Sequence, residues 1–268
     1  MTREEKLQQI LGKNEYDVAD LVTIVELLRA PGGCPWDREQ THRSLRRDFI
    51  EETYEVIEAI DNNDPVLLRE ELGDALLQIV MHARIEEEEG RADFRAIAAD
   101  VCRKMIHRHP HVFGEVKADS VGEVLANWEQ IKSDEKSRNT VTDKLNAIPR
   151  QLPALMRAAK VGKKAKELDF PDIGAVLEKL EEETAEVRAA LDSGDRGACA
   201  EEIGDLLFTV AQLSRFAGVE AEEALTRATD KFVRRFSAVE AAVTADGKDL
   251  GEMSDAEKDL YWQKVKKM

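Results

Sequence analysis

Apolar residues recur every three to four positions along nearly the whole chain of 268 residues, and runs of alternating apolar and polar residues are hard to find. This spacing is typical of amphipathic α-helices that turn one face toward a core. It predicts an all-α fold, with helices over residues 15–30, 41–61, 65–89, 92–108, 121–137, 153–167, 173–192, 196–217, 220–242 and 255–267.

Turn-forming residues separate several of these helices. Asp64 followed by Pro65 is typical of a helix start, because Asp supplies a capping oxygen and Pro presets φ at the first helical position. Gly90 suits a helix end. The stretch PGGCPWD at residues 31–37 predicts a loop, and residues 139–153, with two prolines among polar residues, predict a linker.

The chain contains an internal duplication. At a fixed offset of 131 residues, residues 51–77 align without a gap on residues 182–208, and 13 of the 27 positions are identical. Two shorter pairs follow in the same order, KMIHR (104–108) with KFVRR (231–235) and WEQIK (128–132) with WQKVK (262–266). We therefore expect two tandem copies of one helical-bundle unit, namely an N-terminal repeat at 1–138, a linker at 139–153 and a C-terminal repeat at 154–268.

Each copy places carboxylates at the edge of an apolar helix face. On a helical wheel, Glu52 and Glu55 turn toward the apolar side of their helix, whereas Glu51 points away. Residues three apart share a face, so the spacings ExxE and ExxD each present a pair of carboxylates. A short turn between the two helices could gather four of them: Glu52, Glu55, Glu71 and Asp74 in the first copy, and Glu183, Glu186, Glu202 and Asp205 in the second.

Four carboxylates on a half-buried face require protonation, basic partners or cations. Oxygen ligands favour Mg²⁺, with Mn²⁺ able to replace it, and the absence of His and Cys from the set disfavours zinc. An isolated ExxE is more often a salt-bridged surface, but repetition at the same wheel angles favours a metal site. Gly73 and Gly204 are expected to mark the close approach of another group, because glycine inside a helix costs about 1 kcal/mol relative to alanine.

Basic and aromatic residues at helical spacing are the candidates for holding a phosphate ligand. Lys231 with Arg235, and Trp262 with Lys266, each lie one turn apart and could grip a triphosphate and stack a base. Taken singly, such residues are more often a solvated lysine or a core tryptophan. In the sequence HRHPH (107–111), Pro110 should end the helix, which favours a polar loop over a zinc site.

The composition narrows the range of partners. The chain has 55 acidic and 39 basic residues and a formal net charge of −16, which argues against a nucleic-acid polymer as partner. No apolar run approaches the roughly 18 residues that span a bilayer, and the first residues show no targeting pattern, so no membrane partner and a cytoplasmic location are expected. Three cysteines without a CxxC pair indicate free thiols.

The ordered set of motifs resembles that of the MazG nucleoside triphosphate pyrophosphohydrolases, within an all-α pyrophosphatase superfamily. The motifs are EETYE with ELGD, EETAE with EIGD, GGCPWD, RHPHVFG, NWEQIK and KFVRRF, and they cover essentially the whole chain. The resemblance implies Mg²⁺-dependent cleavage of nucleoside triphosphates between the α and β phosphates, with broad specificity, by a homodimer whose C-terminal repeat is the catalytic one. Two alternatives remain open, a pyrophosphatase selective for one deoxynucleotide or damaged nucleotide and a non-catalytic acidic helical regulator.

The resemblance also implies roles for individual residues. The metal ligands of the working repeat would be Glu183, Glu186, Glu202 and Asp205, with Glu52, Glu55, Glu71 and Asp74 as a second candidate site. Independently of the resemblance, one of two glutamates, Glu186 or the preceding Glu182, is the catalytic candidate for orienting or deprotonating the attacking water. The candidates for substrate binding are Lys179, Lys231, Arg235, Trp262, Lys266 and, from the first copy, Lys132.

Overall fold

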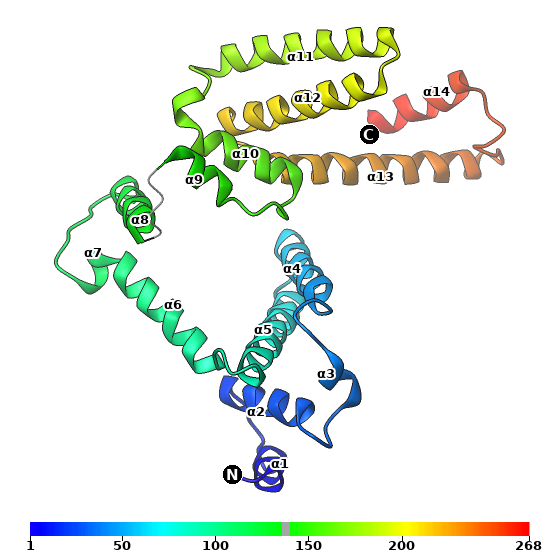
Figure 1. The fold of residues 1–268 in the computed structure, drawn as a ribbon. Coiled ribbons are helices and arrows are strands. Elements are labelled where there is room, and N and C mark those ends of the chain that lie inside the picture. The colour runs from blue at the N-terminus through cyan, green and yellow to red at the C-terminus, as the bar shows by residue number, and fades with distance from the viewer. Residues whose placement is uncertain (136–139, 268) are drawn as a thin grey trace. The chain divides into compact units, whose positions relative to one another are not determined.

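The computed structural model describes residues 1–135 and 140–267, and within these ranges it contains helices and no strand (Figure 1). The all-α prediction is confirmed. The chain divides into two compact units, Met1–Lys132 and Ser133–Met268. The boundary expected between residues 138 and 139, and the end of the helix expected over 121–137, lie outside the described residues. No helix in the described ranges is both long enough and apolar enough to cross a membrane.

The first unit is built on two long antiparallel helices, α4 (Arg46–Asp61) and α5 (Pro65–Glu88). A third helix, α2 (Val18–Arg29), packs on α5. These helices enclose a core of Val25, Leu45, Val80, Met81 and Ile85. The remaining helices of the unit are α1 (Arg3–Leu11), α3 (Pro35–Glu39), α6 (Phe94–Arg108), α7 (Pro110–Phe113) and α8 (Val121–Glu135).

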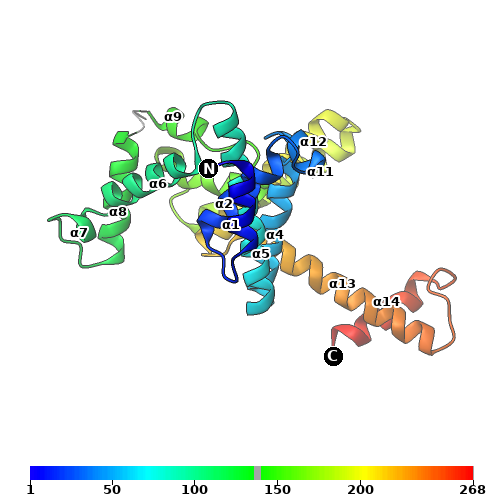
Figure 2. The ribbon, with the colours of Figure 1, turned by 90° about the horizontal axis from the view of Figure 1, so that it is seen from below.

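The second unit repeats the antiparallel pair as α11 (Ile173–Ser193) and α12 (Arg196–Phe216). Helix α10 (Ala154–Lys164) packs on α12, and α9 (Val141–Asn146), inside the expected linker, packs on α10. A second hairpin joins α13 (Ala221–Ala245) to α14 (Asp255–Lys266) around Val239, Val243, Met253 and Tyr261. Figure 2 shows this hairpin running away from α11 and α12. One turn of 3-10 helix, η1 (Lys166–Leu168), follows α10.

The same turn closes both carboxylate-bearing hairpins. Asp64 accepts hydrogen bonds from the backbone N–H groups at the start of α5, which confirms the predicted capping role, and Asp195 does the same for α12. The preceding residue is left-handed in both turns, with φ of 53° at Asn63 and 72° at Gly194. Asn and Gly are the residues that adopt this conformation at least cost. The duplication in sequence is therefore a duplication of the hairpin itself.

The prediction of a loop over residues 31–37 is wrong at its end, because Pro35 begins the short helix α3. The chain folds back on the end of α2, where the backbone N–H of Cys34 donates to the carbonyl oxygen of Leu28 at 2.8 Å. Arg29, only 9% exposed, donates to the backbone carbonyl of Asp37 within α3 and to that of Gln40 directly after it, and it pairs with Glu88 at 2.7 Å. The motif GGCPWD thus packs on the end of α2, and Arg29 links α2 and α3 to α5.

Gly33 is the position where this fold-back leaves least room. A Cβ there would lie 2.2 Å from the carbonyl oxygen of Leu28 and 2.4 Å from that of Leu27, and neither backbone atom can move without opening the end of α2. We expect Gly33→Ala to lower the free energy of unfolding by about 2 kcal/mol, the usual cost of overpacking, in urea denaturation. Gly122→Ala, whose Cβ would meet only Ser120 Oγ at 3.9 Å, is the control. An equal loss in both variants would contradict the packing argument.

Candidate active site

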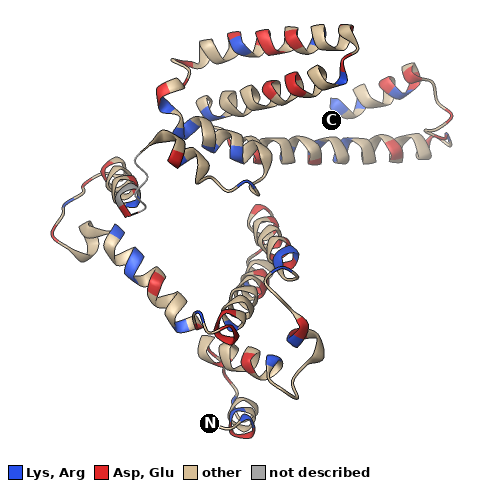
Figure 3. Cartoon of the chain, viewed as in Figure 1, with Lys and Arg blue, Asp and Glu red and all other residues tan. Residues whose placement is uncertain are grey.

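Three carboxylates converge on the inner face of the α11–α12 hairpin. One oxygen from each of Glu183, Glu186 and Glu202 can be chosen so that all three lie within 4.8 Å of one another. Figure 3 shows the acidic segments on both α11 and α12. Asp205, the fourth residue of the predicted set, is exposed and lies outside this triplet, although its charge reaches Glu202. The hairpin thus brings three of the four predicted ligands within reach of one ion, and the fourth, Asp205, lies outside this group.

Glu183 is the buried member of the triplet, with 4% of its surface exposed. Its Oε1 lies 2.9 Å from Nζ of Lys179, and Lys179 also donates to Glu182 at 2.7 Å. These two contacts raise the pKa of Lys179. The other oxygen of Glu183, Oε2, is buried and has no hydrogen-bond partner among the described residues. A buried carboxylate oxygen without a donor is costly, so this atom is aimed at something that the chain itself does not supply.

The carboxylates of the triplet lie close enough together for their negative charges to repel one another. Burial raises the pKa of Glu202, and the charges of Glu186 and Asp205 add to the shift. Glu182, by contrast, is exposed and turned toward Lys179, as the wheel angles predict for the leading glutamate. The arrangement can either take up a proton or hold a cation.

The first repeat forms an equivalent triplet on the α4–α5 hairpin. Oxygens of Glu52, Glu55 and Glu71 also lie within 4.8 Å of one another. Burial raises the pKa of Glu52, with Asp74 the next largest cause, and burial likewise raises the pKa of Glu71. Within the described residues, these two triplets are the only groups of three or more His, Cys, Asp or Glu side chains close enough to hold one ion.

One charge distinguishes the two triplets. At the offset that aligns the repeats, Lys179 corresponds to Asp48 in α4. The second triplet therefore has an ammonium group beside its buried glutamate, whereas the first has a further carboxylate at that position. The sequence could have revealed this difference, because Lys179 and Glu183 are four residues apart on one helix face.

No group in the described part of the chain approaches the two mid-helix glycines, so the expectation of a close neighbour there stays a prediction. A Cβ added at Gly73 or at Gly204 would meet no atom of the chain within 4 Å. Both residues are exposed, so neither is required by the packing of its own unit.

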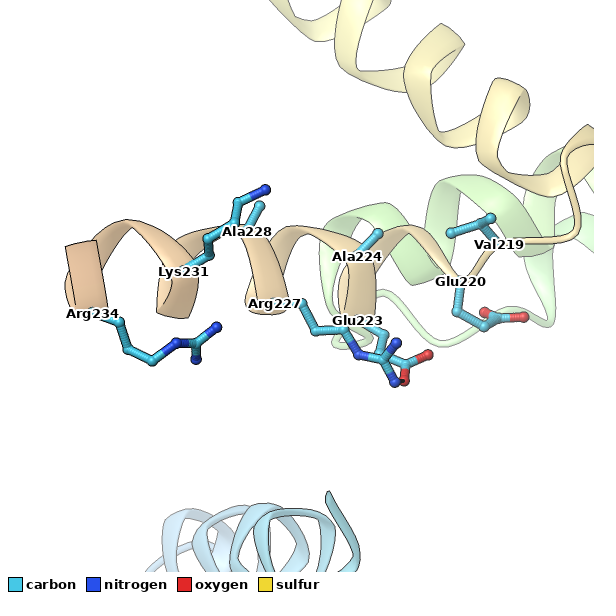
Figure 4. Close-up of a pocket in the computed structure, with 8 residues that line it drawn as sticks. All are labelled: Val219, Glu220, Glu223, Ala224, Arg227, Ala228, Lys231 and Arg234. Atoms are coloured by element: carbon cyan, nitrogen blue, oxygen red, sulfur yellow. Dashed lines mark hydrogen bonds and ion pairs between the residues drawn. The ribbon is translucent and has the colours of Figure 1, made fainter. Parts of the chain in front are cut away.

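The predicted basic pair lies on α13, a different helix from the two that carry the triplet. Lys231 is exposed and lines an open hollow of about 400 Å³ together with Arg227 and Arg234. Figure 4 shows Arg227 against Glu223 below the helix, Arg234 on the same side and Lys231 rising from the other. None of the ion pairs found in the described ranges joins Lys231 or Arg235 to the carboxylates of α11 and α12. Arg227 and Arg234 were not predicted, although their spacing from Lys231 places all three on adjacent turns.

The predicted aromatic and basic pair lies on α14. The ring of Trp262 packs against Phe232 of α13 with centroids 5.4 Å apart. Trp262 also lines a second hollow, of about 550 Å³, between α13 and α14. Lys266 is exposed in the last turn of α14. Lys132 ends the first unit, with its Nζ 3.7 Å from Glu129, so the structure does not assign it to the second triplet.

In the part of the chain that the structure describes, the histidines of HRHPH (107–111) are not among the groups close enough to share one ion. Helix α6 ends at Arg108, as the proline predicts, but Pro110 begins the short helix α7, so the prediction of a loop there is wrong. His109 bonds through Nδ1 to the carbonyl oxygen of Met105 at 2.6 Å and packs edge-on to Trp128 at 4.9 Å. Arg108 is buried and lies over the same tryptophan at 5.4 Å.

Comparison with known proteins identifies this pair of acidic hairpins. The model of the MazG nucleotide pyrophosphohydrolase domain matches residues 40–113 and 158–239, each of which contains one hairpin. The chain belongs to the MazG family. It is 44% identical over 252 residues to a nucleoside triphosphate pyrophosphohydrolase of Escherichia coli K12, covering 92% of this chain and 96% of that protein. A nucleoside triphosphate pyrophosphohydrolase/pyrophosphatase MazG of Thermotoga maritima is 43% identical over 249 residues, covering 92% and 94%.

Proposed function

We propose that this chain is a Mg²⁺-dependent hydrolase that converts nucleoside triphosphates to the monophosphate and pyrophosphate, with broad base and sugar specificity. The observation that carries the proposal is the convergence of Glu183, Glu186 and Glu202, with one buried oxygen of Glu183 lacking a donor among the described residues. The names of the relatives that align over nearly the whole chain support the same activity.

The residues present fit a magnesium ion. Mg²⁺ takes oxygen ligands, is bound by one or two carboxylates, and keeps waters that a phosphate can replace. Glu183, Glu186 and Glu202 supply only oxygens, and Asp205 adds a further carboxylate close by. When bound, the ion supplies positive charge to the phosphate oxygens and lowers the pKa of a water. Mn²⁺ has similar ligand preferences and is expected to replace it.

The chain's own residues would divide the remaining work. Glu186, or the exposed Glu182, orients the attacking water and accepts its proton. Lys179 holds Glu183 in place at 2.9 Å and adds positive charge beside the cluster. Lys231 and Arg235 would bind the phosphates that leave as pyrophosphate, and Trp262 offers a face for stacking the base.

The second repeat is proposed as the working one because of Lys179. A phosphate chain approaching the second triplet meets an ammonium group, whereas at the first triplet the corresponding residue is Asp48. The first repeat also buries Arg108, which aligns with Arg235, against Trp128. The first hairpin is therefore proposed to contribute architecture, with a second metal-binding triplet at Glu52, Glu55 and Glu71.

We propose a homodimer as the functional assembly. Large apolar side chains of the second unit remain exposed, including Leu191 at 61%, Leu207 at 50%, Phe232 at 55% and Val233 at 55%. A second copy of the chain that covered these side chains would remove apolar surface from water, as a subunit interface does. Sedimentation velocity at micromolar concentrations would test it, and a monomer there would contradict it.

A product assay tests the function directly. Purified protein is incubated with each of the eight common ribo- and deoxynucleoside triphosphates and Mg²⁺, and the products are separated by ion-exchange chromatography. Monophosphate plus pyrophosphate from most substrates is the expected result. Turnover of one nucleotide alone would replace broad specificity by the selective alternative, release of orthophosphate would contradict the bond assignment, and no turnover would favour a regulator.

A substitution that removes one negative charge from the triplet should separate its effect on metal binding from its effect on folding stability. The raised pKa of Glu202 means that its carboxyl stabilises the fold below its ordinary value of 4.5, and that this contribution is lost as pH rises through the folded-state pKa. Glu202→Gln should therefore melt above wild type at pH 7.5 without divalent ions. Mg²⁺ should raise the melting temperature of wild type and leave the variant nearly unchanged.

Scanning fluorimetry after treatment with EDTA provides the measurement. Glu201→Gln is the matched control, since Glu201 is the exposed neighbour outside the triplet. It should respond to Mg²⁺ as wild type does. If Glu202→Gln melted below wild type without metal, the crowded-charge interpretation of the triplet would be wrong.

A further inference from the structure

Two histidines of the first unit face each other nitrogen to nitrogen. His42, in the turn before α4, and His82, in the second half of α5, have their Nδ1 atoms 2.7 Å apart. The ring planes are within 6° of parallel, with centroids 5.0 Å apart. A hydrogen bond of this length between two imidazoles needs one N–H and one bare nitrogen, so a single proton lies between the rings.

Glu86 determines which nitrogen carries that proton. The Nε2 of His42 lies 2.8 Å from Oε1 of Glu86, and Arg91 donates to both oxygens of the same carboxylate. The hydrogen bond from Arg91 is the largest cause that lowers the pKa of Glu86 to about 2. An ionised carboxylate only accepts, so Nε2 of His42 must donate to it. Neutral His42 therefore presents a bare Nδ1, and His82 donates to it.

Within the described residues, the charged groups in contact with the pair are Glu86 and Arg91. Besides Glu86, Arg91 approaches His42 Nε2 at 3.4 Å, where both groups donate to the same carboxylate oxygen. From α4, the uncharged ring of Phe49 packs on His82 with centroids 5.7 Å apart. Burial lowers the pKa of His82, the neighbouring His42 lowers it further, and Glu86 opposes the shift.

The hydrogen bond between the two rings is kept when the pair takes up one proton and is lost when it takes up two. When His42 is protonated, its own Nδ1–H donates to His82, and the hydrogen bond survives with reversed direction. When His82 is protonated as well, two N–H groups point at each other and two positive rings adjoin. Neither ring can then accept, and the contact opens.

We propose that His42 and His82 form a proton-controlled clasp, which ties the segment entering α4 to α5 at neutral pH and releases it in acid. The clasp lies at the entrance of the hairpin that carries Glu52, Glu55 and Glu71. Its opening loosens residues 40–46 locally. At the offset that aligns the repeats, Ile173 and Leu213 stand at the positions of His42 and His82, so the clasp belongs to the first unit alone.

The sign of the pH effect follows from linkage. A histidine whose pKa is lowered by folding stabilises the fold above its ordinary value of 6.5, and that contribution is lost as pH falls through the folded-state pKa. The contribution of Glu86 is present above 4.5 and is lost only as pH falls toward 2. On acidification the contribution of the clasp therefore begins to fall below 6.5, and that of the Glu86 ion pair begins to fall only below 4.5.

Hydrogen exchange of the full chain, followed by mass spectrometry at pH 7.5 and 5.0 and corrected for intrinsic rates, tests the clasp. In wild type, the peptide covering residues 40–46 should lose protection severalfold at the lower pH, because the open form becomes more populated. His82→Gln keeps a donor for Nδ1 of His42 but cannot take up a second proton, so its protection should stay the same at both values. His82→Phe should be unprotected at both.

His107→Gln, on α6, is the control and should behave as wild type does. An equal pH response in wild type and His82→Gln would overturn the proposal, and so would a wild-type peptide with constant protection. If His82→Phe does not fold, the comparison of wild type with His82→Gln still decides. Histidine titration by NMR gives a second measurement, in which His82 should titrate below 6.5, and a value at or above 6.5 would also overturn it.

Discussion

Replacing Glu183 and Asp205 together by alanine is expected to reduce pyrophosphate release by roughly a thousandfold or more, because metal ions supply several kcal/mol of charge stabilisation in phosphoryl transfer. The double variant removes the buried carboxylate beside Lys179 and a charge that acts on Glu202. Initial rates with a nucleoside triphosphate and saturating Mg²⁺ give the measurement. Circular dichroism would establish that the variant keeps the helix content of the wild-type chain.

The matched control lies in the same chain. Glu52→Ala with Asp74→Ala makes the same chemical change at the first triplet, and it should leave most of the activity in place. If this variant were inactive while the Glu183 and Asp205 variant kept full activity, the assignment of the working repeat would be wrong. Equal loss in both would indicate that the two triplets act together.

Much of the carboxylate hairpin is predictable from sequence, because helix periodicity determines on which face of the helix each side chain lies. The wheel separates Glu183, which is buried, from its neighbour Glu182, which is exposed. The turn is equally local, since Asp64 and Asp195 cap the helices that follow them. Whatever depends on residues three or four apart on one helix, or on a turn of four residues, is written in the local sequence.

Short elements and close approaches are predicted less well. Helix α1 is absent from the predicted helices although its local signal is clear, namely a capping box in which Thr2 Oγ1 accepts from Glu5 N–H at 3.2 Å. Helices α3 and α7 instead begin at prolines, which by themselves equally indicate a loop. At Gly73 the described part of the chain places no atom within 4 Å of the Cβ position, so packing within the chain does not explain this glycine. The steric demand falls on Gly33, whose contacts come from the chain folding back on α2.

The position of α13 relative to the triplet cannot be predicted from the local sequence. The spacing of Lys231 and Arg235 predicts that they share a helix face, but not where that face points. The structure sets α13 and α14 as a hairpin of their own, with Trp262 against Phe232. Tertiary packing between helices depends on whole faces, which the sequence of one helix does not specify.

Lys179→Asp gives the second repeat the residue that the first repeat has at this position, Asp48. It is expected to lower kcat/KM by about a hundredfold. The ammonium group lies 2.9 Å from Glu183 and 2.7 Å from Glu182, so the substitution replaces attraction by repulsion at the buried end of the triplet. Substrate phosphates would also meet a negative charge there, which should raise KM as well as lower kcat. Steady-state kinetics over a range of Mg²⁺ concentrations gives the measurement.

The reciprocal change distinguishes the lysine's own role from general damage. Asp48→Lys gives the first triplet the charge pattern of the second, and it should leave the activity of the second repeat unchanged. Lys163→Asp, an exposed charge reversal on α10 outside the triplet, is the matched control and should retain wild-type kcat/KM. If Lys179→Asp also retained it, Lys179 would not distinguish the two repeats, and the choice of the second as the catalytic one would lose its physical basis. The repeats would then differ in their surroundings rather than in the charge at this position.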